Sequence, residues 1–201
     1  MSLAVPARCI SIFSNASGQV FSNLWLAGLA EYDEMKGIAW DWQSIDVAMG
    51  KAPLAQECVG PNPTDRGRNG RKRRLLVDGR GVPLSLVASE AYLGDRDLLP
   101  TTLDQMVGTR PKPRRNGPKH LCADAGYRGD PAWNAARARH DRPHIKQRRE
   151  EAYAKRTQPV YKARCWVVER AHSWLNRFRK LLVSFEKTEA SYVAYSALPQ
   201  P

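Results

Sequence analysis

The clearest pattern of apolar and polar positions lies near the C-terminal end of the chain. Between residues 167 and 185, apolar side chains recur every three or four positions, which is the period of an amphipathic helix. Trp174 and Leu175 fall on the apolar stripe, whereas Glu169 and Asn176 fall on the polar face. The spacing therefore predicts one long helix, in which Trp174 packs against the core.

Alternating and short apolar runs predict strands elsewhere. Residues 38–47 alternate, so that Trp42, Ser44 and Asp46 share one face of a strand. A long loop rich in glycine and proline follows. Further strands are expected at 73–77 and 82–90, joined by a hairpin turn at Asp78-Gly-Arg-Gly81, and at 121–124 and 142–146. Helices are expected at 20–35, 98–107 and 131–140.

The order of these elements indicates the fold class. Three antiparallel strands come first, and alternating helices and strands follow them. This order is typical of an α/β protein with an RNase H-like mixed sheet and flanking helices. We assign residues 38–198 to this domain. Fold alone leaves the function open.

The distribution of charge favours a nucleic-acid partner. The net formal charge is +12, yet the first 60 residues carry −3 and the remainder carries +15. Basic side chains concentrate at 66–74 and again at 142–180, where the net charge is +9. Such fields attract the phosphates of DNA. A basic solvated surface without a nucleic-acid partner is the alternative.

Cysteine spacing and hydropathy argue against other classes of protein. The four cysteines are scattered without a C-x-x-C pair, which indicates neither a disulfide framework nor a zinc ribbon. We find no pattern of a signal peptide and no apolar run long enough for a membrane span. With the basic charge, these features lead us to expect a cytoplasmic, nucleoid-associated protein without a membrane partner.

Three acidic residues are candidates for a metal site. Asp46 and Asp124 end predicted strands, and Glu169 projects from the polar face of the last helix. Carboxylates that converge from separate elements suit a pair of Mg²⁺ ions that cut a phosphodiester. Roles in turns, caps and surface ion pairs are the alternative for each of them. Position alone does not distinguish them from three other boundary acids, Asp78, Asp95 and Asp97.

Longer motifs surround these acids. They read WDWQSID (40–46), PNPTDRG (61–67), LVDGRGVP (76–83), LCADAGY (121–127), PHI (143–145) and WVVERAHSWLNRFR (166–179). Together they resemble the catalytic region of bacterial insertion-sequence DDE transposases of the four/five type, over residues 25–195. The resemblance implies that Asp46, Asp124 and Glu169 are catalytic and bind two Mg²⁺ ions, for which Mn²⁺ can substitute.

The resemblance also implies a reaction and partners. It implies metal-dependent cleavage of DNA at transposon ends, followed by strand transfer into target DNA by a homodimer bound to double-stranded DNA. We expect contacts with the DNA backbone from Arg71, Lys72, Arg73, Arg164, Arg170, Asn176, Arg177 and Lys180. Ordinary solvated positions are the alternative for the helical arginines. For Tyr127, next to Asp124, we expect a packing role.

The chain also departs from the family pattern. Relatives carry an N-terminal helical domain that recognises transposon ends, and residues 20–35 correspond at most to its last helix. We therefore expect residues 1–37 to be a loosely ordered remnant of that domain in a truncated copy. Ala125, Cys165 and Ser184 stand where basic residues are common. A catalytically silent, DNA-binding remnant is the alternative function; an unrelated RNase H-like nuclease is disfavoured by the motifs.

Overall fold

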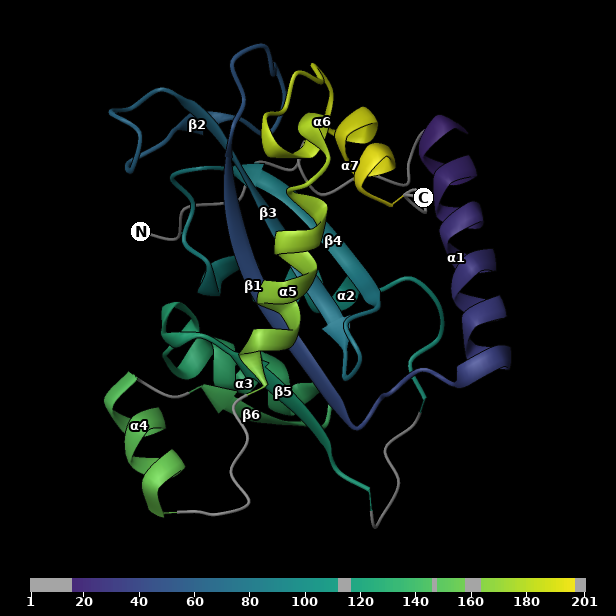
Figure 1. Ribbon diagram of the computed structural model, residues 1–201, viewed down its shortest axis with the longest axis vertical. Helices are drawn as coiled ribbons and strands as arrows, with labels where there is room; N and C mark the ends of the chain where they lie inside the picture. The colour runs from purple at the N-terminus through teal and green to yellow at the C-terminus, as the bar shows by residue number, and fades with distance from the viewer. Residues whose placement is uncertain (1–15, 112–116, 146–147, 158–163, 198–201) are drawn as a thin grey trace.

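A mixed sheet forms the centre of the protein. The computed structural model describes residues 16–111, 117–145, 148–157 and 164–197 (Figure 1). The strands within this part of the chain are β1 (Trp42–Lys51), β2 (Gly60–Pro61), β3 (Asn69–Asp78), β4 (Pro83–Glu90), β5 (Lys119–Ala123) and β6 (Asp141–Ile145). Their order is β2-β3-β1-β5-β6, and β4 also pairs with β3.

The strand directions confirm the expected fold class. β3 pairs antiparallel with both β1 and β4, whereas β5 runs parallel to β1 and to β6. Leaving aside the two-residue β2, the sheet has the antiparallel start and the parallel continuation of an RNase H-like fold. β1 therefore lies at the centre, with β3 on one side and β5 on the other.

Helices cover both faces of this sheet. They are α1 (Ala16–Lys36), α2 (Leu99–Asp104), α3 (Asp130–Ala138), α4 (Arg148–Thr157), α5 (Cys165–Leu175), α6 (Arg179–Leu182) and α7 (Glu189–Ala197). In Figure 1, α5 crosses the near face of the sheet, and α2 and α3 lie behind it. None of the helices that the structure describes is long and apolar enough to cross a membrane.

Two apolar clusters, one on each face, hold the layers together. One cluster unites Ile45, Leu76 and Leu121 of the sheet with side chains of α2 and α3. The other unites Leu75 and Val77 with side chains of α5 and α7. Successive residues of a strand point to opposite faces of the sheet. In β1, the Ile45 side chain therefore points to the α2–α3 side and the Asp46 side chain to the α5 side.

The predicted C-terminal helix is interrupted. The apolar period continues from 167 to 185, but α5 ends at Leu175 and α6 begins at Arg179, because Phe178 between them has an extended backbone. Trp174 is 48% exposed, so its predicted packing in the core is wrong. The sequence analysis also missed α4 and α7.

The helix expected at residues 20–35 is present as α1, and it packs on the domain. The indole Nε1 of Trp25 donates a hydrogen bond to Pro83 O at 3.3 Å, and Leu29 is buried. Residues 1–15, the first part of the segment expected to be loosely ordered, lie outside the described residues. The division at residue 37 stays a prediction.

Candidate active site

The parallel pairing of β1 and β5 brings two of the three predicted acids together. The register aligns Ile45 with Ala123, and each strand continues directly into an aspartate, Asp46 and Asp124. The carboxyl ends of parallel neighbours meet at one edge, and partners in register point to the same face. Asp46 and Asp124 therefore stand side by side, toward α5.

Helix α5, which carries Glu169, is fastened to β1. Ser44 Oγ donates a hydrogen bond to Arg164 O, just before the helix, at 3.0 Å. One turn beyond Glu169, His172 Nε2 lies 3.2 Å from Asp46 O. Burial, with a contribution from Arg73, lowers the pKa of His172 to about 4, so the ring is neutral and Nε2 is its donor. The helix is thus hydrogen-bonded to the residue that carries the first acid.

The charges of the acids act on one another. Burial is the main cause that raises the pKa of Asp46 from 3.8 to about 6, and the charges of Asp124, Glu169 and Asp95 add to it. A hydrogen bond with the backbone of Val47 opposes the rise. Burial also raises the pKa of Asp124, where the charge of Asp95 contributes. The three predicted acids therefore share one electrostatic neighbourhood.

These side chains suit a hard divalent cation in their chemistry. All three offer carboxylate oxygens, which Mg²⁺ and Mn²⁺ prefer, and a cation would relieve the repulsion that raises the pKa of Asp46. Among the described residues, no group of three His, Cys, Asp or Glu side chains is close enough to hold a metal ion together. Asp46 and Asp124 follow residues that pair in register on neighbouring strands, whereas Glu169 does not form a group of three ligands with them.

The turn after Asp124 contributes a buried hydroxyl. Tyr127 is 1% exposed and belongs to the apolar cluster on the α2–α3 side, which confirms its packing role. Among the residues that the structure describes, its hydroxyl nevertheless has no hydrogen-bond partner. Burial raises its pKa, with the charges of Asp95, Asp46 and Asp124 adding to the rise and Arg74 opposing it. The charges of these carboxylates therefore reach the hydroxyl.

Sequence reasoning missed Asp95, whose charge reaches both Asp46 and Asp124. Asp95 follows β4, just before a 3-10 turn at Arg96–Leu98, and we had treated it as an ordinary boundary acid. No local pattern singles it out, because its proximity to Asp124 arises from the packing of the loop after β4.

Three of the predicted DNA contacts are contradicted by the structure. Arg71, Lys72 and Arg73 are 2%, 8% and 2% exposed, because β3 is a central strand covered on both faces. Their donors are used inside the protein: Arg71 binds Glu57 O and Ser184 Oγ, Lys72 binds Leu93 O and Asp95, and Arg73 binds Asn176 Oδ1. This cluster is part of the core and is not available to DNA.

The remaining predicted contacts lie on or beside α5. Arg170, Asn176, Arg177 and Lys180 are exposed, and Arg164 is half-buried. Arg170 donates to Arg80 O at 2.7 Å and stacks on Trp166, with its guanidinium carbon 4.9 Å from the ring centroid. Arg164 stacks on Trp42 at 5.0 Å. Together these side chains place positive charge near Glu169, which is the condition that phosphate binding requires.

Comparisons with known proteins identify the family of this chain. The family model described as a transposase DDE domain matches residues 33–195. A relative from Burkholderia cepacia, described as a transposase for insertion sequence element IS402, is 37% identical over 143 residues. The match covers 70% of this chain and 65% of that relative, so the chain spans just under two thirds of its length.

A solved structure also matches, at low similarity. It is described as the Mos1 transposase paired-end complex with the left transposon end, at 10% identity and a TM-score of 0.39, covering 90% of this chain and 59% of that one. The assignment rests instead on the family model, which spans most of the chain, and on the insertion-sequence relative. The chain belongs to the transposase DDE domain family.

Proposed function

We propose that this chain is the catalytic part of an insertion-sequence transposase of the four/five type, which cuts DNA at transposon ends and joins them to target DNA. The observation that carries the proposal is the register of β1 and β5, which sets Asp46 beside Asp124 beneath the helix of Glu169. Membership of the DDE family supports it. Its partners would be double-stranded DNA and a second copy of the chain.

The proposed mechanism assigns the metal to the three acids. Two divalent ions, when bound, activate the attacking oxygen and stabilise the departing one. Asp46 and Asp124 would hold Mg²⁺, or Mn²⁺ in its place, from the sheet, and Glu169 would complete the ligands from α5. Arg170 on α5 and Arg177 just after it, both exposed, would hold the DNA phosphates and orient the scissile bond.

Cleavage of a defined DNA substrate tests this proposal. The substrate is a duplex that carries the ends of the insertion sequence around the gene, incubated with the full chain and Mg²⁺ and analysed for nicks on a denaturing gel. We expect nicking at the ends that EDTA abolishes and that Asp124→Asn loses. Equal nicking by the wild type and Asp124→Asn would contradict the assigned acids.

A catalytically silent, DNA-binding remnant is the second candidate. One observation favours it: the three carboxylates are not gathered into one ligand group among the described residues. The same experiment separates the two candidates. Retained binding of the end DNA without nicking, in both Mg²⁺ and Mn²⁺, would favour the remnant.

A further inference from the structure

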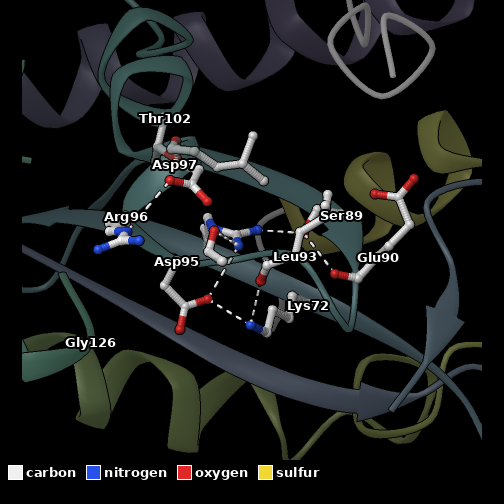
Figure 2. Close-up of polar contacts among 12 residues, drawn as sticks. Lys72, Ser89, Glu90, Leu93, Asp95, Arg96, Asp97, Thr102 and Gly126 are labelled. Atoms are coloured by element: carbon white, nitrogen blue, oxygen red, sulfur yellow. Dashed lines mark hydrogen bonds and ion pairs between the residues drawn. The ribbon is translucent and has the colours of Figure 1, made fainter. Parts of the chain in front are cut away.

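Two buried cations of β3 fix the position of Asp95. Lys72 Nζ donates to Asp95 Oδ1 at 2.8 Å and to Leu93 O at 2.7 Å. Arg74 Nη2 donates to the same Oδ1 and to Gly94 O, both at 3.2 Å. Figure 2 shows the contacts of Lys72 with Asp95 and Leu93 in the loop after β4. Because both cations bind Oδ1, they hold the carboxylate in one orientation.

The second oxygen of Asp95 faces the turn that carries Asp124. A Cβ atom on Gly126 would lie 3.6 Å from Asp95 Oδ2 and 3.1 Å from Asp124 Oδ1. Gly126 N also donates to Asp124 Oδ1 at 2.9 Å. Both carboxylates therefore lie close to the position that a side chain at residue 126 would take.

Tyr127 supplies a second, independent observation. Its side chain is 1% exposed, and its hydroxyl has no hydrogen-bond partner within the part of the chain that the structure describes. The charged groups that act on it are Arg74 and the three aspartates 95, 46 and 124. A buried hydroxyl without a partner is costly, so it indicates a polar partner that the protein itself does not supply. Since three carboxylate charges act on the hydroxyl, a hydrated cation is a partner that would suit it.

We propose that Asp95 and Tyr127 are positioning residues, which hydrogen-bond the water molecules of a divalent cation held by Asp46 and Asp124. The inference rests on the proposed function. Mg²⁺ keeps several of its waters when it binds protein, and groups that bind those waters strengthen the site. Lys72 and Arg74 form ion pairs with Asp95, and its charge still reaches Asp46 and Asp124, so it adds to the attraction for a cation.

Binding of Mn²⁺ to the full chain tests the proposal without relying on activity. Free Mn²⁺ is measured by electron paramagnetic resonance at pH 7.5 in wild type, Asp95→Asn, Tyr127→Phe and the matched control Asp97→Asn. Asp97 lies two residues away with a 60% exposed side chain. We expect Asp95→Asn to weaken binding by about 10- to 100-fold, Tyr127→Phe to weaken it less, and Asp97→Asn to leave it unchanged.

Asp124→Asn makes the failures distinguishable. If Asp124→Asn loses Mn²⁺ and Asp95→Asn binds it like the wild type, Asp95 only anchors its loop and the inference is wrong. If Asp124→Asn also binds like the wild type, the metal site of the proposed function is wrong. Tyr127→Phe covers the case in which Asp95→Asn does not fold, because it removes only a hydroxyl from an apolar cluster. Unchanged Mn²⁺ affinity in folded Tyr127→Phe would overturn the role of the hydroxyl.

Discussion

Asp46 is ionised at neutral pH in an environment that disfavours its negative charge. Replacing it with a neutral side chain should therefore stabilise the metal-free fold. Burial and the charges of Asp124 and Glu169 raise its pKa from 3.8 to about 6. A shift of this size corresponds to about 3 kcal/mol. Because the side chain is only half-buried, solvent screening reduces this to roughly 1–2 kcal/mol. In Asp46→Asn the side-chain oxygen can still accept the hydrogen bond from the backbone of Val47.

The sign of the effect depends on pH. A folded-state pKa above the unfolded value means that stability is lost as pH rises between the two. The contribution of Asp46 should therefore be lost between about pH 4 and 6, and Asp46→Asn should lack this part of the loss. We expect the variant to melt at nearly the wild-type temperature at pH 4 and roughly 2–8 °C higher at pH 8.

Thermal unfolding followed by circular dichroism in EDTA, from pH 4 to 8, measures this difference. Asp97→Asn is the control, because its exposed carboxylate should give a flat difference across the range. Mg²⁺ should raise the melting temperature of the wild type and leave Asp46→Asn unchanged. A variant that is less stable than the wild type at pH 8, or a difference that does not change with pH, would refute the electrostatic reasoning.

Three further predictions concern packing, a buried acid and DNA. A Cβ on Gly70 would lie 2.9 Å from Asn62 Cβ, so Gly70→Ala should lose about 1–3 kcal/mol in urea unfolding. At Gly28 in α1, no described atom lies within 4 Å of the position of an added Cβ, so Gly28→Ala should raise the free energy of unfolding by about 0.5–1 kcal/mol. A stabilised Gly70→Ala together with a destabilised Gly28→Ala would contradict the packing described at these two glycines. Burial raises the pKa of Glu189 from 4.5 to about 8, with Arg71 opposing and the charges of Glu57 and Glu90 adding to the rise. The free energy of unfolding of the wild type should therefore fall as pH rises from about 5 to 8. In urea titrations, Glu189→Gln should show a smaller fall with pH and should be more stable than the wild type at pH 9 by roughly 2–4 kcal/mol. The same dependence on pH in both proteins would exclude an ionising Glu189. Finally, the affinity for DNA, measured by fluorescence anisotropy, should drop at least about tenfold between 50 and 200 mM salt. Arg177→Ala should reduce the slope of log affinity against log salt concentration by about one. An affinity that does not change with salt would contradict phosphate binding.

The alternation of apolar and polar residues was enough to predict the sheet. Strand β1, the β3–β4 hairpin and β5 follow from local patterns, and with them the position of Asp124 directly after β5. Asp46 was expected at a strand end, but it lies inside β1, because β3 pairs with β1 as far as Lys51. Glu169 follows from helical spacing alone. The family motifs were still needed to select these acids, because boundary acids such as Asp78 have the same local appearance. In the structure Asp78 has a turn role: its Oδ1 accepts from the backbone N–H groups of Arg80, Gly81 and Val82.

The basic run of β3 could not be interpreted from sequence. A run of four basic residues normally indicates a solvated surface, yet here each side chain reaches acceptors that lie far away along the chain. Arg71 meets Ser184, and Arg73 meets Asn176 more than a hundred residues later. Asp95 was missed for the same reason, since its cations are Lys72 and Arg74. Pairings of this kind depend on tertiary packing, which a local pattern does not contain.

The pairing of β1 on both edges also limits how this gene can change over time. Strand parity decides which face carries Asp46, so inserting one residue between the β5-paired segment and Asp46 would turn the carboxylate toward the α2–α3 side. Inserting two would restore the face but displace the carboxylate by about 7 Å. The alternation of faces does not constrain the length of the loop at residues 52–59, because its residues lie outside the strands. Length variation among related genes should therefore collect in that loop and be excluded from residues 42–46.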